Sequence, residues 1–558
     1  MLRRGLLLAV AALFLAPSAR AADPILPLAQ VKPGMKCTGL SVLRGTTISQ
    51  FGVEVLDVLG TDTTFSGPRI LIRVSGPAID ATGIGPGFSG SPILCPGAGG
   101  ALANAGAISE GLGEYGNKVA LATPIEEVLT DAPAAAARVS RRPEIARAAR
   151  PLASPLSVSG VSAATLSLLQ RAASRAGTPV FAAPPGPAGG YPPQPLVPGA
   201  AVGAALSSGD VAVSAVGTVA YRDGARLWAF GHPFDAVGRR SLFLQDAYIF
   251  GIINNPLGVP ELGAQTYKLA SGGGNVQGTI TTDAVAAVAG TVGSVTPAVP
   301  LTVSARERGG RSVTLESRLA DERALGYGAG LSLIGPLAAS QALSQVLRSA
   351  PPVTLAMCVR FVVKGRSRPL GFCNPYFGVD PALFDLSDAA ALVDSFDLAP
   401  LDLERARVSM RVRRGVTRDV LVSAALPDRV RPGQRVRARV VTLRRGGERR
   451  RLSFRFRLPR DLRPGRQTVV LAGNGGEDFS GDDLILVLSE ALGEEFGGEG
   501  AAEPRSVRQL ARRLAAFRRP LGIELRRKRR RPKVVYEAED VSFEGSVRVS
   551  LRVVRAGR

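Results

Sequence analysis

The sequence predicts a mainly β, multidomain fold, and three observations support this prediction. The chain has 558 residues, enough for about three or four domains. Glycine and proline are abundant, at 65 and 41 residues, whereas aromatic residues make up only 5%. Short runs of alternating polar and apolar residues recur between turn-forming residues, a pattern typical of strands. With 45% hydrophobic residues the chain can bury several cores, which excludes a mainly disordered protein.

The chain is strongly basic, with a formal net charge of +23 and an isoelectric point near 10.9. Most of the excess is arginine beyond residue 400. In 435–440 and 452–458 arginine largely alternates with apolar residues, which predicts strands with one buried and one solvated face. We therefore expect no nucleic-acid partner. An anionic cell-envelope polymer stays open as a partner, with the basic run 526–531 as its contact.

The N-terminus has the pattern of an export signal. Arg3 and Arg4 precede an apolar stretch over 6–16, and Ala19-Arg20-Ala21 matches the small-x-small cleavage pattern. The apolar stretch is shorter than the roughly 20 residues that a membrane span needs. The sequence therefore predicts a signal peptide over 1–21 and a mature protein without an integral membrane span. We expect it to be secreted or held at the cell surface.

The four cysteines favour two disulfides, because exported proteins fold in an oxidising compartment. Cys358 and Cys373 flank a short strand-like hairpin and are the more local pair, which would leave Cys37 for Cys95. Three pairings are open from the sequence. With one histidine in the chain, a Cys/His zinc site is not expected. No motif supports another metal or a cofactor.

Composition and strand patterns divide the chain into seven parts. In order, they are a signal peptide (1–21), a first strand-rich half (22–131), an Ala/Pro/Gly-rich linker or surface loop (132–200), a second strand-rich half (201–300), a strand-rich accessory region (301–402), a β-sandwich-like module (403–475) and a basic α+β region (476–558). Strands are predicted over 51–59 and 69–74, and Ser506 can cap a helix in the last part.

The segment 83–92 (Gly-Ile-Gly-Pro-Gly-Phe-Ser-Gly-Ser-Pro) carries the strongest chemical signal. A serine nucleophile needs its hydroxyl on a sharp turn, beside backbone N–H groups that can hold an oxyanion. Glycine allows the dihedral angles of such a turn. The N–H groups of Gly87 and Ser89 are spaced to converge on one oxygen. The alternative interpretation is a Gly/Ser turn between strands.

Such a serine needs a general base, and His232 is the only histidine in the chain. It lies between Gly231 and Pro233 at the end of a predicted strand, where a rigid scaffold usually presents functional groups. A structural histidine is the alternative interpretation. Together the two motifs predict Ser89 as nucleophile and His232 as base more strongly than either motif alone.

At these residues the chain resembles the SpoIVB-type serine peptidases. Residues 87–92 look like the family's G-M-S-G-S-P motif, and residues 229–232 (Ala-Phe-Gly-His) are similar to its A-L-G-H-G motif. Three further segments are similar to family segments, so that the resemblance covers roughly residues 31–295: 122–127, 216–219 and 278–290. The resemblance assigns the nucleophile role to Ser89 and the base role to His232.

It also implies a fold and an activity. The expected fold is a chymotrypsin-like double β-barrel, followed here by β-sandwich-like accessory domains. The expected activity is limited, regulatory cleavage of protein or peptide substrates, self-cleavage included.

The chain departs from the family in two respects. Its serine half precedes its histidine half, so the two halves would be circularly permuted; geometry and not chain order defines a triad. The family has its acid a short way before the serine motif, where this chain has Gly76. Four aspartates are candidates for the missing acid, and their spacing in the sequence does not select one of them: Asp80, Asp235, Asp246 and Asp283. The third triad residue stays open, and a pair without an acid can still work slowly.

The sequence thus predicts an exported serine endopeptidase. The rival hypothesis is a catalytically weak or inactive peptidase fold that serves as a cell-envelope binding scaffold. Gly76 favours the rival, whereas the presence of both Ser89 and His232 opposes it.

Overall fold

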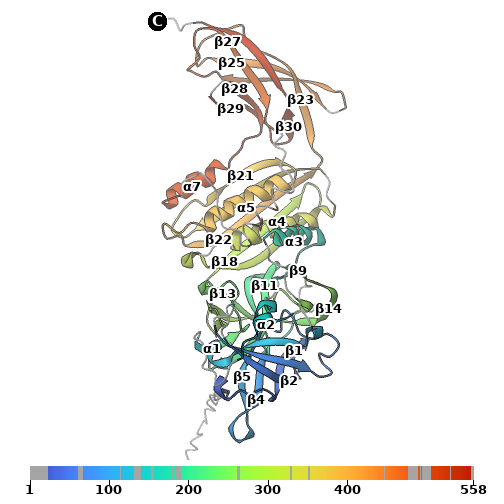
Figure 1. The fold of residues 1–558 in the computed structure, drawn as a ribbon. Helices are drawn as coiled ribbons and strands as arrows, with labels where there is room; N and C mark the ends of the chain where they lie inside the picture. The colour runs from blue at the N-terminus through green and yellow to red at the C-terminus, as the bar shows by residue number, and fades with distance from the viewer. Residues whose placement is uncertain are drawn as a thin grey trace, which may run out of the picture.

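The computed structural model describes residues 23–554 apart from 61–66, 113–114, 131–139, 153–155, 177–179, 183–189, 260–263, 327–329, 350–351, 445, 528–529 and most of 476–503. The predicted signal peptide lies outside the described residues. Strands make up 51% and helices 18%, which confirms the mainly β prediction. Three layers follow one another in Figure 1: a pair of β-barrels, a sheet with helices, and a β-sandwich at the opposite end.

The first barrel is a closed sheet with strand order β4-β1-β2-β3-β6-β5, in which β4 pairs back onto β5. Its strands are β1 (Lys36–Arg44), β2 (Thr47–Leu59), β3 (Arg69–Ser75), β4 (Pro92–Pro96), β5 (Leu102–Gly111) and β6 (Val119–Pro124). The predicted strands at 51–59 and 69–74 are confirmed. Alternating burial explains the first of them, because Phe51, Val53 and Val55 all point into the core, whereas residues 69–72 of the second are buried on both faces of the sheet. A disulfide joins Cys37 to Cys95, as expected.

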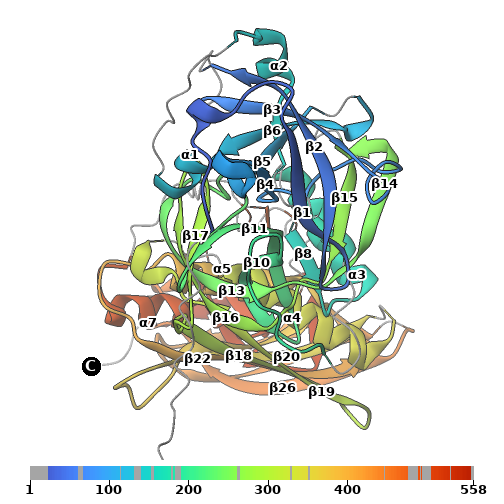
Figure 2. The same cartoon turned by 90° about the horizontal axis from the view of Figure 1, so that it is seen from below.

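The second barrel has strand order β10-β13-β16-β17-β12-β11 and closes through β10 and β11. Its strands are β10 (Ala201–Gly209), β11 (Ala212–Asp223), β12 (Arg226–Ala229), β13 (Gly238–Asp246), β16 (Val276–Asp283) and β17 (Val288–Val292). A hairpin of β14 (Ile249–Val259) and β15 (Ala264–Ala270) leaves this barrel and lies beside β1 (Figure 2). The predicted double β-barrel is therefore confirmed, with the serine half first.

The segment between the barrels has more structure than a linker. It contains α2 (Pro143–Ala148), β7 (Arg150–Pro151), β8 (Leu156–Ser159), α3 (Ala163–Arg175) and β9 (Val180–Ala182). Strand β7 pairs with β5 of the first barrel, whereas β8 pairs with β11 of the second. The prediction missed these pairings because strands of two to four residues carry too little alternation to recognise.

The middle layer is a sheet that carries helices. Its strands are β18 (Ala298–Glu307), β19 (Ser312–Ala320), β20 (Val353–Val363), β21 (Leu370–Phe377) and β22 (Leu403–Arg414), and its helices are α4 (Gly330–Leu347) and α5 (Asp380–Asp394). The sequence predicts a strand-rich region here, so both helices differ from the prediction. Helix α4 is buried on nearly all sides, so no polar face reveals a helical period. The disulfide between Cys358 and Cys373 joins β20 to β21, as expected.

The β-sandwich has two sheets around one core. The first sheet contains β23 (Thr417–Ala425), β25 (Arg435–Arg444), β26 (Arg449–Arg457) and β30 (Val541–Glu544); the second contains β24 (Arg429–Val430), β27 (Gly465–Gly473), β28 (Gly522–Arg527), β29 (Arg530–Glu537) and β31 (Ser546–Val553). Three arginines of β25, Arg435, Arg437 and Arg439, are exposed and alternate with buried apolar residues, as the sequence predicts.

The sandwich differs from the predicted module at 403–475. Strand β22 pairs with β18 and β20 of the middle sheet, and the second sheet of the sandwich is completed by chain beyond residue 520. Helix α7 (Val507–Ala516), which Ser506 caps, lies against β21. The basic run 526–531 includes the end of β28 and the start of β29, and its residues 528–529 lie outside the described residues.

The remaining short helices are α1 (Ile125–Thr130) and 3₁₀ turns at Leu28–Gln30, Ala98–Gly100, Tyr115–Asn117 and Arg323–Leu325. Among the helices that the structure describes, none is both long and apolar enough to span a membrane.

Candidate functional site

The serine and histidine motifs meet at the seam between the two barrels. The Thr218 N–H of β11 donates to the Ser89 carbonyl at 2.8 Å. Gly90 has φ of +90°, and a Cβ at this position would overlap the Thr218 carbonyl and the Phe230 backbone. Only glycine allows this approach. The fold therefore brings together two motifs that lie about 140 residues apart in the sequence.

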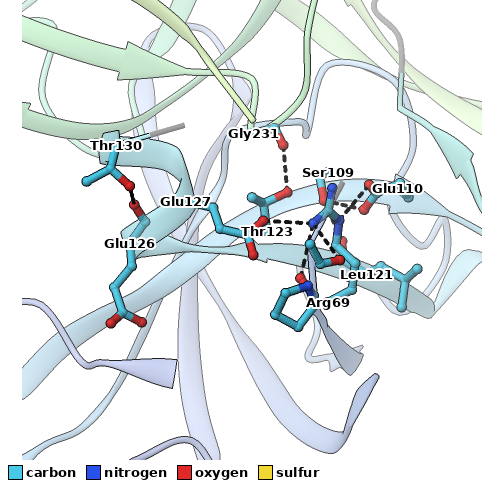
Figure 3. Close-up of polar contacts among 11 residues, drawn as sticks. Arg69, Ser109, Glu110, Leu121, Thr123, Glu126, Glu127, Thr130 and Gly231 are labelled. Atoms are coloured by element: carbon cyan, nitrogen blue, oxygen red, sulfur yellow. Dashed lines mark hydrogen bonds and ion pairs between the residues drawn. The ribbon is translucent and has the colours of Figure 1, made fainter. Parts of the chain in front are cut away.

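Contacts across the seam hold the histidine motif on the first barrel. Thr123 of β6 donates its hydroxyl to the Gly231 carbonyl at 2.7 Å, as Figure 3 shows. Trp228 and Tyr221 pack into an apolar cluster with residues of the first barrel, among them Ile125 of α1. The residue directly before His232 is therefore fixed by both hydrogen bonding and packing.

Two peptide N–H groups of the serine motif are free. The Pro86 carbonyl accepts an N–H of β15 at 3.0 Å, and the Phe88 carbonyl accepts the Ser91 N–H at 2.9 Å. Because a trans peptide directs its N–H opposite to its carbonyl, the N–H groups of Gly87 and Ser89 point away from these partners. Neither N–H has an acceptor within the described chain. These are the two donors that the sequence assigns to the oxyanion hole.

The Ser89 hydroxyl is also free. The residue has no solvent exposure, and its Oγ has no hydrogen-bond partner among the residues that the structure describes. A buried hydroxyl without a partner is uncommon and costs stability, so its presence needs an explanation. The structure places Ser89 beside the histidine motif without a hydrogen bond between Ser89 and His232.

His232 is buried and makes two contacts with backbone carbonyls. Its Nδ1 lies 2.7 Å from the Pro233 oxygen, and its Nε2 lies 3.2 Å from the Leu152 oxygen. Burial lowers the pKa of His232 below its ordinary 6.5, although the Pro233 carbonyl and the Glu110 carboxylate act in the opposite direction. The ring is thus neutral at pH 7 and carries one proton, so only one of the two carbonyl contacts is a hydrogen bond, and the shorter contact favours Nδ1 as the donor. Nε2 then carries the lone pair that a general base needs.

None of the four aspartates contacts the histidine ring by a hydrogen bond. Asp283 instead accepts the N–H groups of Phe234 at 2.7 Å and Asp235 at 2.6 Å, in the loop that begins with Pro233. It thereby positions the carbonyl that orients His232. The other three have different partners: Asp80 pairs with Lys118, Asp235 with Arg240, and Asp246 with Tyr191, Gln194 and Asn275. Gly76 has φ of +118° and forms a turn.

A buried ion network of Arg69, Glu110 and Glu127 lies near the hydrogen bond between Thr123 and Gly231 (Figure 3). Arg69 lies 2.9 Å from Glu110 and 3.0 Å from Glu127, and all three side chains are about 5% exposed or less. Burial alone would lower the pKa of Arg69, but the two carboxylates outweigh it and raise that pKa. The network fixes β3, β5 and α1 to one another. No local pattern in the sequence predicts this network.

Lys268 of β15 is a second residue that the sequence analysis missed. Its side chain crosses the face of Gly87, and its Nζ lies 2.7 Å from Ser41 Oγ, 3.4 Å from Thr218 Oγ1 and 4.4 Å from the Phe88 ring centroid. No carboxylate shifts its pKa among the described residues, and burial lowers that pKa to about 7. The available signal was a lysine on the buried face of an alternating strand.

We predict that Lys268→Met changes how stability depends on pH. An unfolded chain keeps this amine protonated up to about pH 10.5, whereas the folded chain releases the proton near pH 7. The unfolded state therefore binds more protons between these values. Stability of the native chain should rise relative to the variant by up to about 1.4 kcal/mol per pH unit. Urea unfolding at pH 7, 8 and 9, followed by fluorescence of Trp228, the sole tryptophan, measures this difference.

Lys364→Met is the matched control, because the Lys364 side chain is 72% exposed. The difference in free energy of unfolding between Lys364→Met and the native chain should stay constant with pH. If the difference for Lys268→Met is also constant with pH, the prediction is contradicted.

Among the described residues, no group of three or more His, Cys, Asp and Glu side chains is arranged to hold a metal ion. Comparison with known proteins adds no identification, since no family model, no curated protein and no solved structure matches this chain.

Proposed function

We propose that this chain is an exported serine endopeptidase that makes limited, regulatory cuts in protein substrates. One observation carries the proposal. The unpartnered Ser89 hydroxyl lies on a turn whose Gly87 and Ser89 N–H groups are free, at the seam where the only histidine is held by both barrels. A nucleophile, two oxyanion donors and a neutral base are thereby gathered on one rigid scaffold.

In the proposed reaction, His232 takes the Ser89 proton at Nε2 while Ser89 Oγ attacks a peptide carbonyl. The Gly87 and Ser89 N–H groups hold the oxyanion. His232 then gives the proton to the departing amine, and water releases the acyl group from Ser89 by the reverse sequence. The Pro233 carbonyl keeps Nδ1 protonated, in the place where an acid stands in most such sites.

The two disulfides support the exported location in this proposal, because such bonds persist in oxidising compartments. The rival function is a binding scaffold without catalysis. The full burial of Ser89 and the lack of an acid on His232 favour this rival, so the deciding experiment must report on the reactivity of Ser89 itself.

We expect a fluorophosphonate serine-hydrolase probe to label the purified, signal-free chain at pH 7, with the label on Ser89. Ser89→Ala should abolish labelling, and His232→Ala should slow it by about 10²-fold or more because the base is lost. In-gel fluorescence over hours gives the rate, and mass spectrometry of the digested protein locates the label.

Ser91→Ala is the matched control, since Ser91 belongs to the same motif and donates its hydroxyl to Ser41. This variant should still be labelled. A folded chain without label, or label that persists in Ser89→Ala, would contradict the catalytic proposal and favour the scaffold.

A further inference from the structure

Strand β5 has one edge that three segments share. Strand β4 occupies the part from Leu102 to Ala107. At the next residue, Ile108 accepts the Gly90 N–H at 2.7 Å, so the serine motif is bound there. Directly beyond, the Ser109 carbonyl accepts the Leu152 N–H at 2.8 Å, and β7 continues the pairing along Glu110 and Gly111. The segment 150–152 therefore lies next to the serine motif, as an added strand.

Leu152 is the anchor of this segment. Its side chain is 1% exposed, joins the core cluster of the first barrel and covers Gly111, where a Cβ would lie 2.9 Å from Leu152 Cδ2. Its carbonyl oxygen lies 3.2 Å from His232 Nε2, the atom that Ser89 needs as a base. The two preceding residues, Arg150 and Pro151, are exposed. One buried leucine and a set of main-chain hydrogen bonds thus hold the segment.

Addition of an extended strand to a sheet edge is a common way to bind peptides, with main-chain bonds for affinity and side-chain pockets for specificity. From this geometry we propose that residues 150–152 occupy the peptide-binding edge of the protein's own active site. The preferred substrates are then extended polypeptides with leucine at the position of Leu152. The site selects little at the two positions before that leucine. The tethered segment competes with them and keeps the site closed.

Covalent tethering explains why a segment of only three residues is enough to occupy the edge of β5. A strand of three residues binds weakly on its own, but a covalent tether gives it a high effective concentration at β5. A substrate must displace it to reach His232. The inference rests on the proposed function only where it calls the bound peptide a substrate. The docking of a peptide on β5 can be measured without catalysis.

The first experiment measures docking in the Ser89→Ala background, where no turnover occurs. The probe is a fluorescein-labelled peptide amide with the sequence of residues 148–152, Ala-Ala-Arg-Pro-Leu, and the control peptide has aspartate in place of the leucine. By fluorescence anisotropy, we expect Ser89→Ala/Leu152→Asp to bind the leucine peptide at least tenfold more tightly than Ser89→Ala alone. The control peptide should bind neither protein. Equal binding of the leucine peptide to both proteins, or no binding to the double variant, would overturn the inference.

The second experiment measures the rate of fluorophosphonate labelling in chains with an intact Ser89. Leu152→Asp should raise this rate about tenfold, because the segment no longer blocks His232, and Leu152→Ala should raise it less. Leu102→Asp, at the far end of β5 with a 49% exposed leucine, is the matched control and should leave the rate unchanged. The Trp228 emission shows whether Leu152→Asp folds. If it does not fold, Leu152→Ala tests the same prediction.

The two experiments separate the two proposals. Peptide docking that depends on Leu152, without labelling of any variant, would support the peptide-binding edge and reject catalysis. Labelling of Ser89 at a rate that no Leu152 variant changes, without peptide docking, would support catalysis and reject the tethered occupant.

Discussion

Arg69→Met should destabilise the two-barrel unit by about 3–5 kcal/mol, the usual cost of removing one partner from a buried ion network. The variant keeps Glu110 and Glu127 buried without the cation that holds both. Methionine matches the length of the arginine stem, so the loss reports the charge more than the packing. Urea unfolding followed by Trp228 fluorescence measures it, because Trp228 packs against α1 across the seam.

Two controls make the Arg69 prediction specific. Arg73→Met, on the same strand β3 but with a 56% exposed side chain 3.9 Å from Glu54, should shift the midpoint little. Arg69→Met/Glu110→Gln/Glu127→Gln should recover part of the lost stability, because no buried charge is left unpaired. Equal midpoints for Arg69→Met and Arg73→Met would show that the network contributes nothing.

Gly90→Ala should lower the proposed activity strongly although it changes neither Ser89 nor His232. The new Cβ overlaps the backbone of β11 and of the histidine motif, so the two barrels must separate at the seam. Strain at φ of +90° adds about 1 kcal/mol, and overpacking adds about 1–3 kcal/mol. A displacement of about 1 Å between the nucleophile and the base costs about 10²-fold in rate. We therefore expect a lower urea midpoint together with fluorophosphonate labelling reduced about 10²-fold.

Gly34→Ala separates the two causes of this effect. Gly34 has a similar φ of +85° in the same barrel, but nothing lies within 4 Å of the Cβ that alanine would add. This variant should lose only the strain contribution and keep its labelling rate. If Gly90→Ala behaves like Gly34→Ala in both measurements, the close approach at the seam is not what brings the two motifs together.

These predictions concern one arrangement, in which the first barrel supplies the serine motif and the second supplies the histidine. The Thr123 bond to Gly231, the apolar cluster around Trp228 and the close approach at Gly90 all cross the same seam. Changes to the seam should therefore affect stability and labelling together.

The sequence by itself determined the features that depend on neighbouring residues. Short apolar runs rich in β-branched residues predicted the strands at 51–59 and 69–74, and the arginine alternation of β25 predicted a half-exposed strand. Ser506 marked the start of helix α7, where its side chain accepts the Gln509 N–H. The serine and histidine motifs were visible for the same reason, since each is a short run of residues with one backbone requirement.

Only the tertiary structure decided which distant segments meet. The closure of both barrels, the return of the C-terminal strands into the sandwich and the pairing of β7 with β5 depend on contacts between residues far apart in the chain. Lys268, Arg69 and Leu152 stand in unremarkable local sequences and become important through burial against those partners. Burial in a low-dielectric interior is what changes the energy of a charge or a carbonyl, and no local pattern encodes that environment.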